Sequence, residues 1–99
     1  MQVVPAELES YLLGHPKIAD AAVIPKSDAV AGEVPKAFVV LKAGMTATAS
    51  EIQDYIAGKT SHHKHLRGGV EFIQEIPKSA SGKILRRILR DKESQKAKL

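Results

Sequence analysis

Hydrophobic residues in the first third of the chain change from a helical to a strand-like spacing. Leu8 and Leu12 are separated by polar residues at the interval of a helix that buries one face. Pro5 suits the first turn of this helix, and Gly14 ends it. Residues 18–24 then form a small, apolar and partly β-branched run, which predicts a strand.

The middle of the chain predicts a buried strand followed by a helix. A turn-rich connection over residues 25–32 leads to residues 34–41, which lack polar alternation and therefore predict a strand covered on both faces. Residues 48–51 (TASE) have the spacing of a capping box, which begins a helix. Ile52 and Ile56 give that helix its buried stripe.

The last third predicts a strand over residues 70–76, a loop over residues 77–82, and a helix that opens at Lys83. This amphipathic helix is marked by Ile84, Leu85, Ile88 and Leu89. The apolar pattern stops at Asp91, beyond which we expect a frayed end. The order of elements predicts one α+β domain over residues 1–99, with a small three-stranded sheet and helices packed on its faces.

The composition narrows the classes of function. A chain of 99 residues builds one modest core, so a deep cavity for both a nucleotide and an organic substrate is hard to form. With 43% hydrophobic and 26% charged residues, we expect an ordered globular protein. The absence of cysteine excludes disulfides and thiolate metal sites. The sequence has no run of 18 apolar residues, so it predicts no membrane span, and no secretory signal is visible at the start.

The charge is basic and uneven. A formal net charge of +4 favours anionic partners such as nucleotides, phosphates, coenzyme A or nucleic acid. The basic residues concentrate after residue 77, at Lys78, Lys83, Arg86, Arg87, Arg90, Lys92, Lys96 and Lys98. A solvated basic helix is the alternative explanation.

The segment 77–83 (PKSASGK) has the build of a loop that touches a ligand. Pro77 breaks the preceding strand, and Gly82 permits a tight backbone before the helix. A lysine at a helix start is locally misplaced, because the helix dipole is already positive there, and such misfits are typical of functional sites. Lys83 is therefore a candidate anion-binding residue, with an ordinary surface lysine as the alternative. Ile84 follows the lysine, so the loop lacks the magnesium-holding hydroxyl of a Walker A motif.

Several motifs in order resemble one family. PKSASGKILRR at residues 77–87 resembles the C-terminal signature of the acyl-adenylate-forming superfamily, which includes acyl-CoA synthetases, 4-coumarate–CoA ligases and beetle luciferases. QVVPAELESYLLGHPKIADAAV at residues 2–23, AGEVPKAFVVLK at 31–42 and HLRGGVEFIQEIPKS at 65–79 resemble the start, the middle hairpin and the approach to the lysine loop. The resemblance covers nearly the whole chain.

The resemblance implies a mobile C-terminal lid of an ATP-dependent acyl-CoA ligase. In this family a carboxylate attacks Mg-ATP to give an acyl-adenylate, the lid rotates, and coenzyme A takes the acyl group. Lys83 falls on the catalytic, nucleotide-binding lysine, and Gln2 on a nucleotide-binding glutamine, with an ordinary polar residue as the alternative for Gln2. ATP, Mg²⁺ and coenzyme A would be bound mainly by the larger N-terminal domain. The family's hinge residue and second lysine lie before Gln2 and are absent, so we expect the isolated domain to be inactive.

Four further residues are candidates for contacts in the active cleft. Arg86 and Arg87 follow Lys83 at helical spacing and are possible contacts of coenzyme A, although a solvated helix face explains them as well. Gly32 and Glu33 lie in the middle hairpin and are candidates to face the active cleft.

Two other signals concern metals and targeting. His62, His63 and His65 lack a nearby carboxylate or cysteine and the spacing of zinc-binding helices, so we expect no metal site. The ending Ala97-Lys98-Leu99 resembles the small–basic–leucine peroxisomal address, which predicts a peroxisomal import receptor as a partner and otherwise a cytoplasmic protein.

Three alternatives to the ligase lid stay open. The first is the same lid in a beetle-type luciferase, in which oxygen replaces coenzyme A, although PKSASGK is more similar to ligases. The second is a basic nucleic-acid-binding module, which we do not expect because the four aromatic residues lie in apolar stripes and no RNA- or DNA-binding signature is present. The third is a free-standing interaction domain. For the lid we expect the N-terminal domain of the same enzyme, the acyl-adenylate and coenzyme A as partners.

Overall fold

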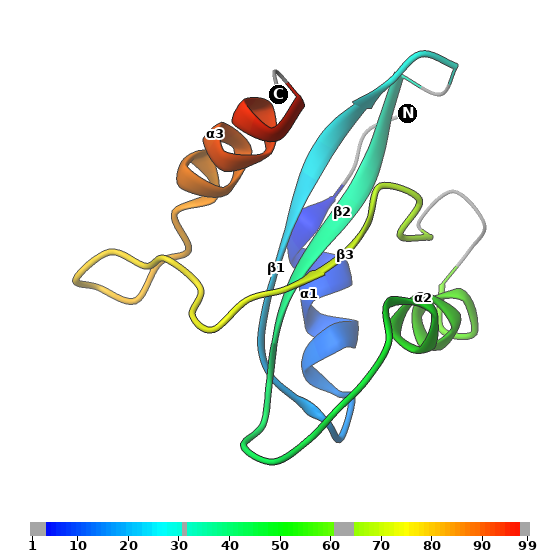
Figure 1. Cartoon of the computed structure of the whole chain (residues 1–99), viewed down its shortest axis with the longest axis vertical. Coiled ribbons are helices and arrows are strands. Elements are labelled where there is room, and N and C mark those ends of the chain that lie inside the picture. Colours follow the sequence, from blue (N-terminus) through cyan, green and yellow to red (C-terminus); the bar gives the residue numbers. More distant parts are fainter. Residues whose placement is uncertain (1–3, 31, 61–64, 98–99) are drawn as a thin grey trace.

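A three-stranded sheet with helices on both faces forms the domain. The computed structural model describes residues 4–30, 32–60 and 65–97. The elements, in the predicted order, are α1 (Pro5–Leu13), β1 (Ile18–Asp28), β2 (Gly32–Leu41), α2 (Ala49–Ala57), β3 (Gly69–Phe72) and α3 (Arg86–Ala97). β1 and β2 form an antiparallel hairpin, and β3 pairs in parallel with β2, so the strand order is β1-β2-β3 (Figure 1). The predicted α+β class is confirmed.

Two hydrophobic layers cover the two faces of the sheet. Successive side chains of a strand point to opposite faces, which assigns Ala37 and Val39 of β2 to one layer and Phe38 to the other. The first layer contains Leu8, Leu12, Ile18, Ala21, Val23, Ala37, Val39, Ile52, Ile56 and Leu66, with α1 and α2 packed on it. The second contains Ala22, Ile24, Phe38, Ile76 and Leu89, with α3 packed on it. The prediction that the central strand is covered on both faces is confirmed.

The start of α2 also follows the sequence. The Thr48 hydroxyl accepts a hydrogen bond from the Glu51 amide at 3.1 Å, which confirms the predicted cap. Lys17 forms an ion pair with Glu51 at 3.0 Å between half-exposed side chains, so its contribution to stability is small.

The strand boundaries differ most from the prediction at the ends of β1 and β3. β1 continues to Asp28, beyond the predicted end near Ile24. The amides of Ala21 and Val23 point away from β2 and donate to carboxylates. Pro25 comes two residues later and so occupies a position whose amide would also point away from β2, which is why a proline does not interrupt the pairing. β3 ends at Phe72, short of the predicted Ile76, because its pairing with β2 stops there.

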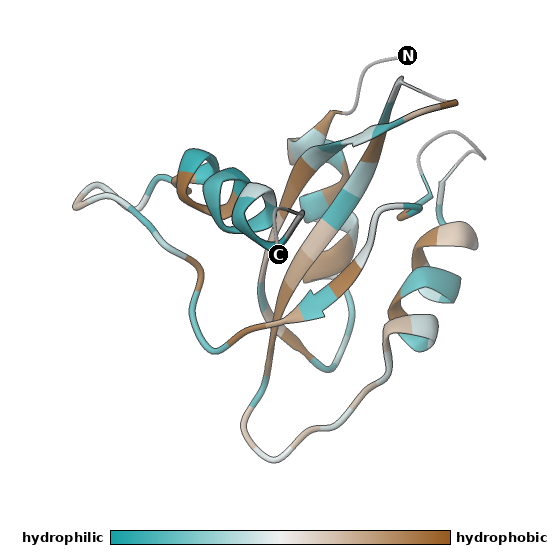
Figure 2. Ribbon diagram, turned by 45° about the horizontal axis from the view of Figure 1, so that its top comes forward, coloured by the Kyte–Doolittle hydropathy of each residue, from teal (hydrophilic) through white to brown (hydrophobic). Residues whose placement is uncertain are grey.

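The last helix differs most from its prediction. α3 begins at Arg86 rather than Lys83, because Ile84 forms an isolated antiparallel bridge with Lys78 and Leu85 donates its amide to Pro77 at 2.9 Å. The helix then continues to Ala97 instead of fraying after Asp91. Figure 2 shows that α3 is hydrophilic over most of its length, so hydrophobic packing alone does not explain this extension.

A network of charges fixes the second half of α3 to the sheet. Lys36 of β2 is only 7% exposed and pairs with Glu71 of β3 at 3.1 Å and with Glu93 of α3. Lys26 pairs with Glu93 at 3.3 Å, and Lys96 with Glu71. Burial alone lowers the pKa of Lys36, but its hydrogen bonds to Glu93 and Glu71 outweigh burial and raise that pKa above 10.5. No helix within the described ranges is long and apolar enough to cross a bilayer.

Candidate functional site: the lysine loop

The segment 78–84, here called the lysine loop, folds back on itself. The Ser79 amide donates to the Lys83 carbonyl at 2.9 Å, and the Gly82 amide donates to the Ser79 carbonyl at 2.9 Å. The Ser79 hydroxyl lies 2.9 Å from that of Ser81 and accepts from the Lys83 amide at 3.2 Å. Gly82 has φ +86°, a conformation that a residue with a side chain rarely adopts. The predicted role of Gly82 in a tight backbone is confirmed, and the loop presents Lys83 directly after the turn.

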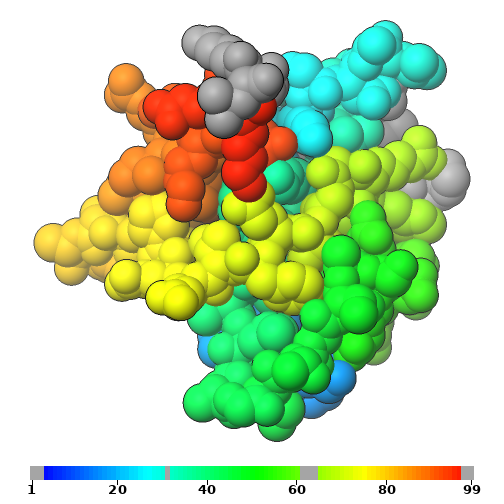
Figure 3. Space-filling model, in the orientation of Figure 1, coloured from blue at the N-terminus to red at the C-terminus, as the bar shows by residue number. Residues whose placement is uncertain are grey.

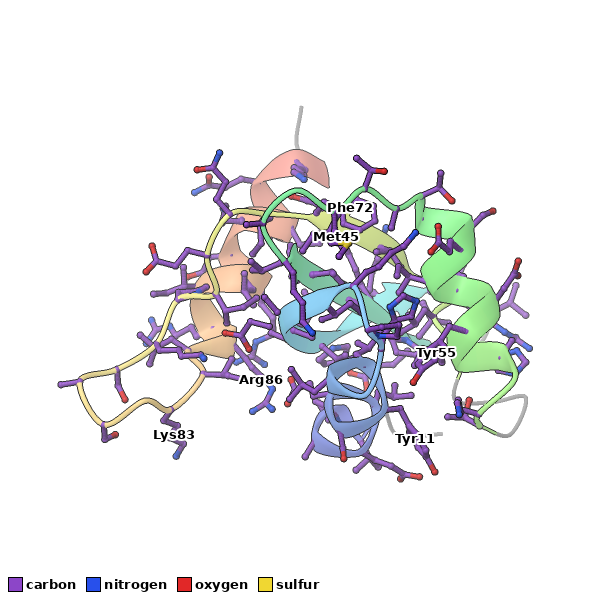
Figure 4. All side chains as sticks on the ribbon, turned by 90° about the horizontal axis from the view of Figure 1, so that it is seen from below. Tyr11, Met45, Tyr55, Phe72, Lys83 and Arg86 are labelled. Atoms are coloured by element: carbon purple, nitrogen blue, oxygen red, sulfur yellow. The ribbon has the colours of Figure 1, made fainter. Side chains whose placement is uncertain are left out.

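Lys83 lies at an exposed position on this loop. Among the described residues its ammonium has no hydrogen-bond or ion-pair partner. Figure 3 shows the lysine loop projecting from one side of the molecule, and Figure 4 shows the Lys83 side chain on this loop, pointing away from the body of the domain. Because α3 begins three residues later, the predicted combination of this lysine with a helix start is wrong. The Lys83 ammonium is accessible from solvent.

Two ion pairs attach the ends of the lysine loop to the body of the domain. At the start, the Lys78 ammonium lies 2.6 Å from the Asp20 carboxylate of β1. Just beyond the end, Arg86 donates to both Glu9 carboxylate oxygens of α1, through Nη2 at 2.5 Å and Nε at 3.2 Å. This two-point geometry fixes the direction of the guanidinium as well as its distance.

The same carboxylates also cap the outer edge of β1. Glu9 accepts a hydrogen bond from the Val23 amide at 2.8 Å, and Asp20 accepts from the Ala21 amide at 2.9 Å. Glu9 is 6% exposed, and its three hydrogen bonds compensate for burying a charge. Each carboxylate is therefore held by the sheet edge while it holds the loop.

These carboxylates were not found from the sequence. Glu9 and Arg86 are 77 positions apart, and Asp20 lies in a strand far from Lys78. Glu9 sits in the polar part of a helical pattern, where an exposed side chain is the default expectation. No local spacing signals a partner at such a separation.

Of the other candidate residues, Gly32 and Glu33 lie apart from Lys83, whereas Arg86 and Arg87 follow it closely in the chain. Gly32 and Glu33 are exposed at the start of β2, and the β1–β2 turn and the lysine loop lie on different sides of the molecule in Figures 1 and 2. Arg87 is exposed on α3, whereas Arg86 is engaged by Glu9. Because Lys83 is not helical, the predicted helix face that it shares with the arginines is wrong; the roles of Arg86, Arg87, Gly32 and Glu33 stay predictions.

Some predicted residues lie outside the described ranges. These are Gln2, His62, His63, Lys98 and Leu99. Ala97 ends α3. In the parts of the chain that the structure describes, no group of three or more histidines or acidic residues is arranged to hold a metal ion.

Lys83 does not line either of two hollows on the surface of the domain. One, of about 300 Å³, lies between β1 and α3 and is lined by Ile24, Pro25, Lys26, Ser27, Arg90, Glu93 and Ser94. Another is lined by Val40, Leu41, Lys42, Met45, Phe72, Ile73 and Gln74.

Figure 4 shows Phe72 and Met45 together, far from Tyr11, so the exposed aromatic residues Tyr11 and Phe72 do not form one stacking surface. This arrangement does not favour the nucleic-acid alternative.

Comparison with known proteins gives a consistent result. Residues 7–83 match the family described as the AMP-binding enzyme C-terminal domain. A 4-coumarate–CoA ligase of Oryza sativa subsp. japonica is 58% identical over 91 residues, which is 92% of this chain and 16% of that protein. A luciferin 4-monooxygenase of Nipponoluciola cruciata is 53% identical over 90 residues, which is 91% of this chain and 16% of that protein.

The solved structures agree with these relatives. An anthranilate CoA ligase in complex with anthranoyl-AMP superimposes with a TM-score of 0.87 at 36% identity, over 100% of this chain and 20% of that one. The chain therefore spans only a small part of the length of the proteins that it matches.

Proposed function

The chain belongs to the family of AMP-binding enzyme C-terminal domains, and from this premise we propose that it is the mobile lid of a larger ATP-dependent acyl-CoA ligase. In the first reaction, a carboxylate oxygen attacks the α-phosphorus of ATP and pyrophosphate leaves. In the second, the lid rotates, the thiol of coenzyme A attacks the acyl carbon, and AMP leaves. Both substrates would be bound mainly by the rest of the enzyme, since this chain spans only a small part of the length of the proteins that it matches.

The observation that carries this proposal is the position of Lys83. Its ammonium is exposed on a protruding loop and has no partner among the described residues, so it is available to an anion on a facing domain. Adenylyl transfer gathers negative charge on the oxygens around the α-phosphorus, and a positioned cation stabilises that charge. Losing one such contact typically slows the chemical step by roughly a hundred- to a thousand-fold.

The remaining contacts are part of the same proposal. Gln2 would touch the nucleotide beside Lys83. Arg87, exposed on α3, would meet the phosphates of coenzyme A, and Gly32 and Glu33 would face the cleft after rotation. Mg²⁺ would arrive with ATP on the other domain, since the described residues of this chain offer it no cluster of ligands.

The experiment is a comparison of two half-reactions in the full-length enzyme. Lys83→Ala should slow acyl-adenylate formation, measured as pyrophosphate release, by about a hundred-fold or more. Transfer from supplied acyl-adenylate to coenzyme A should be affected much less, because the lysine has rotated away. Lys42→Ala, at an exposed lysine distant from the loop in sequence, is the matched control and should affect neither step. Equal losses of both steps in Lys83→Ala would contradict the proposal.

A luciferase is the second candidate. The likeness to a luciferin 4-monooxygenase at 53% identity favours it, because that enzyme class also forms an acyl-adenylate before oxygen reacts. Oxygen-dependent light from the full-length protein with ATP and luciferin would support this candidate. Thioester formation with coenzyme A and no light would support the ligase.

We further propose that the protein is peroxisomal through Ala97, Lys98 and Leu99, read by the peroxisomal import receptor. A fluorescent reporter ending in the last 12 residues of this chain should enter peroxisomes, and the same reporter without Leu99 should stay cytoplasmic. Identical distributions of the two reporters would discard the address.

A further inference from the structure

We infer that Glu9 and Asp20 are positioning residues for Lys83: they clamp both ends of the lysine loop to the edge of β1 and thereby fix where the ammonium points. The inference rests on the proposed role of Lys83 in adenylation. Neither carboxylate would touch a substrate, since each is occupied by a backbone amide and a basic side chain.

The clamp follows from the placement of its four side chains. Lys78 opens the lysine loop and Arg86 follows it, so Lys83 lies between two anchored points. The carboxylates to which they bind belong to α1 and β1, which share one hydrophobic layer and are therefore fixed relative to each other. In Figure 4 the Arg86 side chain points to the same side of the molecule as Lys83, close to the base of the loop.

The carboxylates are oriented before the basic side chains bind them. The Val23 amide holds one Glu9 oxygen at 2.8 Å, and the Ala21 amide holds one Asp20 oxygen at 2.9 Å. A carboxylate already fixed by the backbone loses little freedom when a cation arrives, and it transmits the geometry of the strand to the loop. The Glu9 side chain is 8% exposed, which shields its pair with Arg86 from solvent.

The last helix is attached to the sheet by contacts other than the clamp. α3 keeps its own attachments, through Leu89, which is fully buried, and through the pair of Glu93 with Lys36. Within the lysine loop, Ile84 packs against the second hydrophobic layer, but residues 80–83 are exposed and their hydrogen bonds stay within the loop. Loss of the clamp therefore frees the direction of the loop while the core and α3 remain in place.

The test uses charge-removing variants that keep the backbone contacts. Glu9→Gln and Asp20→Asn each retain a side-chain oxygen for the β1 amide but lose the attraction to Arg86 or Lys78. In the full-length enzyme we expect each to slow pyrophosphate release by about tenfold to a hundredfold, the range that follows from a misplacement of about 1 Å. Thioester formation from supplied acyl-adenylate should stay within about twofold of the parent. Asp54→Asn, an exposed carboxylate of α2, is the matched control and should alter neither step.

The decisive measurement repeats Glu9→Gln in a Lys83→Ala background. If Glu9 acts through the lysine, it has nothing left to position, and adenylation should slow no further. A second loss of the same size as in the parent would overturn the inference, since it would show an effect independent of Lys83. If Lys83→Ala alone leaves adenylation unchanged, the proposed function fails, which separates the two claims.

A variant of Arg86 gives a second test of the clamp. Arg86→Lys keeps a cation but removes the two-point grip, so adenylation should fall while KM for coenzyme A stays constant. A higher KM for coenzyme A with normal adenylation would assign Arg86 to that substrate and overturn the clamp. Should Glu9→Gln fail to fold by circular dichroism, Asp20→Asn carries the test, since its pair with Lys78 is more exposed.

Discussion

Replacing the buried lysine of β2 by methionine should destabilise the domain strongly. Lys36→Met keeps most of the volume of the side chain and removes the charge, so the loss is electrostatic. Breaking a buried ion pair typically costs about 3–5 kcal/mol, because the partner is left uncompensated. After the substitution, Glu71 still pairs with Lys96, and Glu93 still pairs with Lys26. These lysine side chains are 53% and 43% exposed, so solvent weakens their attraction to the two carboxylates. We therefore expect a loss of about 2–3 kcal/mol, or roughly 30- to 150-fold in the unfolding equilibrium.

Urea and thermal unfolding followed by circular dichroism measure this loss. For a domain of this size the expected fall in Tm is about 10–20 °C. Lys42→Met makes the same chemical change at an exposed position after β2 and should stay within about 0.5 kcal/mol of the parent. A cost below about 1 kcal/mol for Lys36→Met would refute the reasoning, because it would mean that burying this ammonium offsets all that its two hydrogen bonds contribute.

Three other outcomes are expected. Burial raises the pKa values of Glu71 and Glu93, but hydrogen bonds from lysines outweigh burial and lower both pKa values below 4.5. The stability that these two carboxylates contribute is therefore complete above about pH 4.5, and it is lost as the pH falls through the lowered pKa values. Urea midpoints should therefore be level from pH 7 to 5 and drop below, and Glu93→Gln should flatten that drop. Gly82→Ala places a side chain at φ +86°, a strain of about 1–2 kcal/mol, and should slow adenylation in the full-length enzyme with an unchanged circular dichroism spectrum. Finally, the isolated chain should fold but release no pyrophosphate from ATP; measurable release would contradict the need for a second domain.

The features that were predicted from the sequence are those encoded by neighbouring residues. The cap of α2 depends on Thr48 and Glu51, three positions apart, and the two-sided burial of β2 follows from an unbroken apolar run. The turn at Gly82 was predicted for the same reason, since the need for a glycine is local.

The features that were missed depend on partners distant in the sequence. Lys36 looks like a surface residue until Glu71 and Glu93 are brought around it, and the same network extends α3 past Asp91. The start of α3 was misplaced because the apolar pattern at Ile84 is equally compatible with a loop that bridges back to Lys78. The anchoring role of Glu9 depends on a contact with a residue 77 positions away, for which no spacing rule exists.

The acidic lining of β1 has a consequence for the behaviour of the domain in concentrated solution. An outermost strand with open amides is a template on which another molecule can add its own strand, and long, flat, uncovered edges are prone to aggregate in this way. On β1 the amides of Ala21 and Val23 are already occupied by the Asp20 and Glu9 carboxylates. An incoming backbone would have to displace two charged acceptors, so the pairing of two copies of this domain through β1 is disfavoured.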